Sequence, residues 1–81
     1  KQNKVSFFGV SGPAHLYVCI PDPTTKLIIE LNGIQVFYND TSLSKKCFKE
    51  DIKLSKNNDL AAYFENFVDG KISIRIKQKA E

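Results

Sequence analysis

The chain of 81 residues has few of the residue types from which active sites are built. It contains one histidine, two cysteines and no methionine, and it lacks a Cys-x-x-Cys pair, a glycine-rich phosphate loop and an EF-hand spacing. Glu50 and Asp51 are neighbours in an alternating segment, so they point to opposite faces and cannot form an acid–base pair. A nucleophilic cysteine beside His15 and a weak calcium site at Asp40 remain alternatives. The prediction is that the chain has no catalytic residues, no metal and no cofactor.

Long apolar runs are also missing. No stretch reaches the roughly 18 residues that a transmembrane helix needs, so we expect no membrane insertion by this chain. Because it lacks methionine and starts at Lys1, we expect a processed or excised piece, from which a signal peptide could have been removed. The net charge of +3 favours solubility and falls short of a nucleic-acid footprint.

The size and the two cysteines bound the class of protein. Residues 1–81 make one small domain with a charged tail from about Lys77. An even cysteine count in a domain with a thin core suits an oxidising compartment. A Cys19–Cys47 disulfide would stabilise the fold by about 3–4 kcal/mol in the loop-closure view. Two buried free thiols would give the same count, so both states remain open.

Asn32-Gly33 is the clearest structural signal. The pair supplies the positive φ angles of a two-residue type I′ turn and therefore predicts a β-hairpin. A regular register places three apolar pairs on the core face and one on the outer face. The core pairs are Leu31 with Ile34, Ile29 with Val36 and Leu27 with Tyr38, and the outer pair is Ile28 with Phe37.

Short alternating segments recur along the rest of the chain, separated by turn residues, and none has helical periodicity with caps. The polar segment 39–46 has the length to cross between two sheets. A last hairpin would pair Phe64 with Ile72, Ala62 with Ile74 and Leu60 with Ile76. The pattern predicts an all-β fold, a single antiparallel β-sandwich of about seven short strands. The expected strands lie near residues 5–8, 15–20, 27–31, 34–38, 48–54, 60–64 and 71–77.

Apolar side chains outside the predicted core are candidate protein contacts. Ile28 and Phe37 form an outward pair, and Tyr17 lies on the corresponding face of the preceding strand. Phe67 and Val68 occupy a loop tip. Each set would also fit a minor second core, so both interpretations remain open.

Binding of single-stranded nucleic acid by a small basic β-barrel is the alternative function. Tyr17, Phe37 and Tyr63 would be the stacking platforms. Asp51 interrupts the basic stripe, and no known motif is present. The outward basic residues are Lys49, Lys53, Lys71, Arg75 and Lys77. Separately, Asn39-Asp40-Thr41 is a glycosylation sequon that also arises by chance.

The second half of the chain resembles small bacterial secreted β-sandwich modules. The matching segments are Leu31-Asn32-Gly33, Val36-Phe37, Ile52-Lys53-Leu54, Asn58-Asp59-Leu60 and Gly70-Lys71-Ile72-Ser73-Ile74, with weaker agreement over residues 11–16. It is also similar to the separate globular β-rich chain of split type IV-like pilins. The resemblance implies a non-catalytic module outside the cell, whose Ile28 and Phe37 face meets a partner helix.

These observations together predict a non-catalytic extracellular module at the cell surface. It would assemble with other protein subunits, either copies of itself or a helical pilin-like chain. The most specific form of this prediction is a globular subunit of a pilus-like filament.

Overall fold

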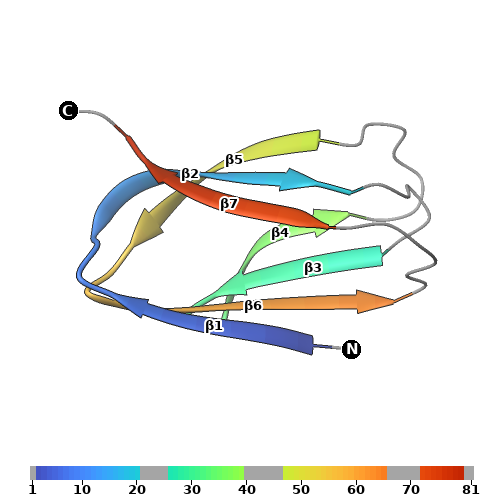
Figure 1. Ribbon diagram of the computed structural model, residues 1–81, viewed down its shortest axis with the longest axis horizontal. Coiled ribbons are helices and arrows are strands. Elements are labelled where there is room, and N and C mark those ends of the chain that lie inside the picture. Colours follow the sequence, from blue (N-terminus) through green and yellow to red (C-terminus); the bar gives the residue numbers. More distant parts are fainter. Residues whose placement is uncertain (1, 21–25, 40–46, 66–71, 80–81) are drawn as a thin grey trace.

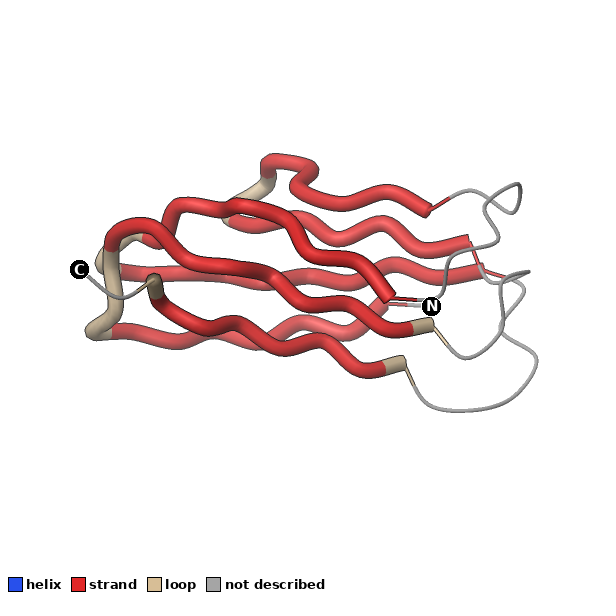
Figure 2. The backbone as a smooth tube through the Cα atoms, turned by 90° about the horizontal axis from the view of Figure 1, so that it is seen from above, coloured by secondary structure: helices blue, strands red, loops and turns tan. Residues whose placement is uncertain are grey.

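All secondary structure in the described part of the chain is β-strand. The computed structural model describes residues 2–20, 26–39, 47–65 and 72–79, and these form seven strands in two antiparallel sheets. The strands run lengthwise in two layers, as the two perpendicular views show (Figures 1 and 2). This confirms the predicted all-β fold and the number of strands.

The larger sheet has four strands and the smaller has three. The order in the larger sheet is β1 (Gln2–Phe8), β6 (Asn57–Glu65), β3 (Lys26–Leu31) and β4 (Ile34–Asn39). The order in the smaller sheet is β5 (Cys47–Leu54), β2 (Gly12–Cys19) and β7 (Ser73–Gln78). β4 and β5 belong to different sheets, so the chain passes from one layer to the other between these strands, as predicted.

The core lies between the layers and follows from the alternation of β2 and β3. Leu16 and Val18 of β2 and Leu27 and Ile29 of β3 are completely buried. Strand side chains alternate between the two faces, so each sheet turns one apolar face toward the other. The intervening residues of β2, such as His15 and Tyr17, lie on the outer face and are half-buried.

The hairpin of β3 and β4 forms around the predicted turn but departs from the predicted register. Asn32 and Gly33 have φ angles of 54° and 81°, as a type I′ turn requires. Counting away from the turn, a β-bulge comes after the pair of Glu30 with Gln35, and the next pair is Ile29 with Phe37. A regular register would have put Phe37 outside.

The predicted outward pair of Ile28 with Phe37 is therefore wrong. Phe37 is 5% exposed and belongs to the core, whereas Ile28 lies opposite Tyr38 on the outer face. The shift also takes Tyr38 out of the core, where its hydroxyl would need a hydrogen-bond partner. One extra residue in β4 thus exchanges a phenol for a phenyl ring in the interior.

The predicted last hairpin is also wrong. β6 pairs with β1 and β3, and β7 pairs with β2 in the other sheet. Leu60 of β6 and Ile76 of β7 therefore face the space between the layers from opposite sheets. The predicted inward residues are confirmed, but the predicted pairing of β7 with β6 in one sheet is wrong.

The disulfide fastens an edge strand to the centre of the smaller sheet. Cys19 and Cys47 lie directly opposite each other on β2 and β5, and they are joined. The link closes a loop that contains β3 and β4 of the larger sheet. This resolves the choice left open by the cysteine count.

Asn58 joins three parts of the chain at one end of the molecule. Its side chain is 1% exposed and donates to the carbonyl oxygens of Ser55 (2.7 Å) and Val10 (3.3 Å). Its Oδ1 accepts a hydrogen bond from the Ser55 amide at 2.8 Å. Next to it, Asn32 of the hairpin turn accepts from the Asp59 amide at 2.8 Å. Buried polar groups with satisfied partners fix the positions of the segments that they join.

Candidate functional site

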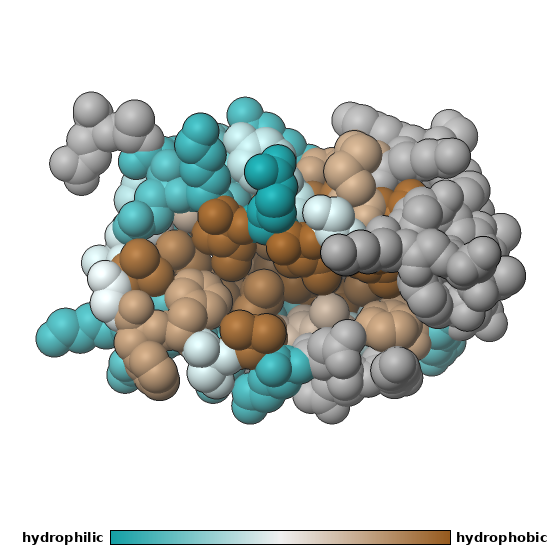
Figure 3. Space-filling model, viewed as in Figure 1, coloured by the Kyte–Doolittle hydropathy of each residue, from teal (hydrophilic) through white to brown (hydrophobic). Residues whose placement is uncertain are grey.

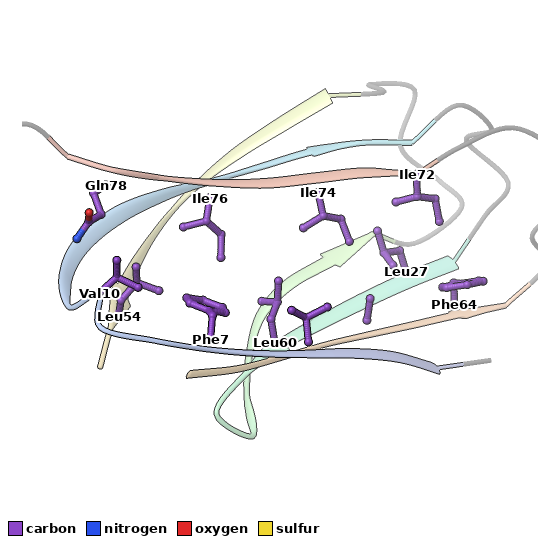
Figure 4. Close-up of a pocket in the computed structure, with 12 residues that line it drawn as sticks. Phe7, Val10, Leu27, Leu54, Leu60, Phe64, Ile72, Ile74, Ile76 and Gln78 are labelled. Carbon is purple, nitrogen blue, oxygen red and sulfur yellow. The ribbon is translucent and has the colours of Figure 1, made fainter. Parts of the chain in front are cut away.

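An apolar groove runs between the two sheets on the side where β1 and β7 form their edges. Its volume is about 600 Å³, and inward-facing side chains from both layers line it. Figure 3 shows the apolar band with polar residues above it and a mixture of apolar and polar residues below it, and Figure 4 shows isoleucines of β7 pointing toward Phe7 and Leu60 on the other layer. The lining residues include Phe7, Leu60, Phe64, Ile72, Ile74 and Ile76.

The opposite side of the molecule is closed. There the Phe37 ring of β4 packs against the Phe48 ring of β5, with 5.1 Å between ring centroids. Val5, which lines the groove from β1, is 60% exposed. The layers therefore diverge from a closed side toward an open one.

Both strands that border the groove have a free edge. β1 is the outermost strand of the larger sheet and β7 is the outermost strand of the smaller one. Such an edge presents a row of backbone N–H and C=O groups that can pair with another strand. The groove thus combines an apolar floor with two rows of unpaired backbone groups in the described part of the chain.

Positive charge lies on the outer faces of β1 and β7, the strands that form the two rims of the groove. Lys4 on β1 and Arg75 and Lys77 on β7 lie at exposed outward positions. Neither strand contains an acidic residue. A strand that paired with the edge of β7 would therefore have its outward residues beside two cations and no carboxylate of β7.

The outer face of the smaller sheet carries Tyr17 between two cations. Lys49 Nζ lies 5.9 Å and Arg75 Cζ lies 5.5 Å from the centroid of the Tyr17 ring. These distances are typical of cation–π contacts. The three residues come from the neighbouring strands β5, β2 and β7, and the two cations contact the half-buried tyrosine at the centre of this face.

A small ionic network lies beside Tyr17. His15 Nδ1 is 3.0 Å and Lys79 Nζ is 3.2 Å from Asp51 Oδ1. Hydrogen bonding and charge attraction from Lys79 hold the pKa of the Asp51 carboxyl below its usual value, and His15 acts in the same direction. Asp51 thus neutralises part of the basic face.

Aromatic residues also lie on the outer face of the larger sheet. Tyr38 and Tyr63 lie opposite Ile28, one on each neighbouring strand. Desolvation raises the pKa of Tyr63, and the charge and hydrogen bond of Glu30 act in the same direction. This row replaces the predicted pair of Ile28 with Phe37 as the apolar feature of this face.

The predicted contact residues do not form one surface. Tyr17 and Ile28 lie on the outer faces of different sheets, Phe37 is in the core, and Phe67 and Val68 lie outside the described residues. The stacking platforms proposed for nucleic acid are separated in the same way, since Tyr63 shares the face of Ile28.

The sequence does not predict the groove, because the expected pairing of residues 60–64 with residues 72–76 places both of its walls in one sheet. The expected pairing of Phe64 with Ile72 would have placed their strands side by side and left no space between them. One sequence signal was present, namely the unbroken alternation of isoleucines in residues 72–76 with serine and arginine between them. That pattern indicates an inward face but does not identify the opposing strand.

Other kinds of site find no support in the described residues. No group of three or more histidine, cysteine, aspartate or glutamate side chains there is arranged to hold a metal ion. Asn39 of the sequon is 1% exposed, so the folded chain has no room for a glycan on its amide. The described part contains no helix with the length and apolarity to cross a membrane.

Comparison with family models, with curated proteins and with solved structures finds no match in any of the three.

Proposed function

We propose that this chain is a non-catalytic extracellular module that assembles with other protein chains. The open apolar groove between β1 and β7 is the observation that supports this most strongly. Contiguous exposed apolar surface with polar rims is typical of sites where another macromolecule binds. An assembly partner would bury that surface.

Two further features favour the same proposal. The Cys19–Cys47 disulfide suits an oxidising environment outside the cytoplasm. In addition, the sequence has a single histidine and no recognised catalytic motif. The most specific form of the proposal is a globular subunit of a pilus-like surface filament.

Immunogold electron microscopy of the source cells tests the filament proposal. An antibody raised against the purified chain is expected to label surface filaments along their length. Substituting Ile74 with aspartate, which introduces a charge into the groove, is expected to remove the label from filaments. The matched variant Ile34→Asp changes an isoleucine that is 69% exposed and lies outside the groove, so it should retain the label. Label confined to the cell interior would reject the proposal.

Nucleic-acid binding is a second candidate because Tyr17 lies between Lys49 and Arg75. An aromatic ring with flanking cations on the outer face of a sheet can stack on a base. Fluorescence anisotropy with a labelled oligothymidine tests this candidate. Binding that weakens steeply as salt rises, and that Tyr17→Ala abolishes, would favour it over the assembly proposal. The absence of binding at physiological salt would reject it.

A further inference from the structure

We infer that the groove binds an extended strand of a partner protein, in which apolar and acidic side chains alternate, and that this strand pairs with the free edge of β7. This inference rests on the proposed assembly function and specifies its partner. It follows from the shape of the groove, the unpaired edge and the charge of the rim.

The backbone favours a strand as the occupant. β7 is the outermost strand of a three-stranded sheet, whereas the facing sheet has four strands. A strand added to β7 would extend the smaller sheet to four and cover the exposed inner face of β1. The six residues of β7 set the length of the occupant at about 20 Å, given about 3.3 Å per residue.

The side chains specify an alternating pattern. Ile74 and Ile76 of β7 point into the groove, and Arg75 and Lys77 point outward. Neighbouring strands place directly opposed residues on the same face, about 5 Å apart. The inward residues of an added strand would therefore contact the apolar floor, and its outward residues would lie beside the two cations. Acidic residues at the outward positions complement them.

Charge also disfavours a second copy of β7 as the occupant. That strand would bring its own Arg75 and Lys77 beside the same two residues of the first molecule. Like charges directly opposite each other destabilise a strand pair. The inference therefore commits to a different chain.

Synthetic peptides test the inference on the unmodified protein. The probe is a capped octapeptide of alternating valine and glutamate, and the controls are a block peptide of the same composition and an alternating valine–lysine peptide. In isothermal titration calorimetry we expect the alternating acidic peptide to bind at least about tenfold more tightly than either control. Equal affinities for the alternating and block peptides would overturn the inference, because a strand-pairing site requires alternation.

Two protein variants test where the peptide binds. Ile74→Asp in the groove is expected to weaken binding at least about tenfold, and Ile34→Asp outside it is expected to leave binding unchanged. Reversing the rim with Arg75→Glu and Lys77→Glu should transfer the preference to the valine–lysine peptide. If the groove variant fails to fold, the rim variant and the peptide series still decide the outcome.

Hydrogen exchange distinguishes strand pairing from simple apolar adsorption. The bound peptide is expected to slow exchange of β7 amides that exchange freely without it. Unchanged exchange, or displacement of the peptide by dodecanoate at equal concentration, would replace the strand with a lipid-like ligand and overturn the inference. Filaments that form although no peptide binds would refute this inference and leave the proposed function standing. Peptide binding without filaments would support this inference and refute the filament form of the proposed function.

Discussion

At the scale of single residues, Asn58 contributes to the fold through its polar atoms. It is buried beside the β1–β2 connection, the β5–β6 turn and the hairpin turn, where it bonds Val10, Ser55 and Asn32. These contacts join the three segments through one buried side chain. Its importance rests on its position in the fold, because Asn57 beside it is exposed.

Replacing Asn58 with alanine should lower the free energy of unfolding by about 1–3 kcal/mol or more, because buried polar groups lose their partners. Urea denaturation followed by circular dichroism measures the change. Asn57→Ala is the matched control and should change stability by no more than about 0.5 kcal/mol. Similar losses in the two variants would contradict the role assigned to Asn58.

Asp51 should make stability depend on pH. A carboxyl whose pKa is depressed in the folded state stabilises the protein when ionised, and this contribution disappears as the pH falls through the folded-state pKa. The ordinary value is 3.8 and the folded value lies below it. Asp51→Asn should therefore be less stable than the wild type near neutral pH, with a difference that shrinks below pH 3.8.

Denaturation of both proteins between pH 2 and pH 7 checks this expectation. Lys79→Gln removes the main partner of Asp51 and should reduce the same pH-dependent contribution. A difference between Asp51→Asn and the wild type that is equal at both ends of the range would contradict the assignment.

At the scale of elements, the hairpin of β3 and β4 shows how one bulge decides the use of a strand. The turn fixes Leu31 opposite Ile34. The register shift between Glu30 and Ile29 then reverses the faces on which the later residues of β4 lie. As a result Phe37 reaches Phe48 of the other sheet and closes one side of the core. Without that contact, the side of the sandwich formed by β4 and β5 would lack the aromatic pair that joins the two sheets there.

Phe37→Ala should cost about 3–5 kcal/mol of stability because it leaves a cavity at a buried aromatic contact. Tyr38→Ala is the adjacent control, and its side chain is 44% exposed. We expect a change below about 1 kcal/mol for the control by chemical denaturation. A larger loss in Tyr38→Ala than in Phe37→Ala would indicate the regular register without the bulge.

At the scale of the whole molecule, the two long sides of the sandwich differ in how well their edge strands are held. β2, β3 and β6 have a paired neighbour on each side, whereas β1 and β7 are edges that border the groove. The edges on the other side are held by the disulfide and by the packing of Phe37 on Phe48. The open side is therefore where the fold should be most accessible to another strand.

Native-state hydrogen exchange should rank the strands in that order. The amides of β2, β3 and β6 are expected to exchange at least about tenfold more slowly than those of β1 and β7, because opening an edge breaks fewer contacts. Two-dimensional NMR after transfer into deuterated solvent measures the rates strand by strand. Protection of β7 equal to that of β3 would show that its edge is already covered.

The local features of this protein follow from its amino-acid sequence. Asn32-Gly33 specified its turn because the positive φ angles it needs are available to those residues. The alternation in β2 and around Ile74 specified strands with one inward face, because the period of two is a property of each segment alone. The expected all-β fold followed from these segments and their spacing.

Which strands pair with one another depends on contacts between distant parts of the chain. The bulge between Ile29 and Glu30 is accompanied by the contact of Phe37 with Phe48 in the other sheet, and β7 pairs with β2 although its pattern would equally suit β6. Both outcomes depend on contacts between residues far apart in the chain. The alternation of apolar and polar residues within a strand is the same whichever strand it pairs with. The groove exists because Leu60 and Ile76 face each other across two sheets, an arrangement that no local pattern encodes.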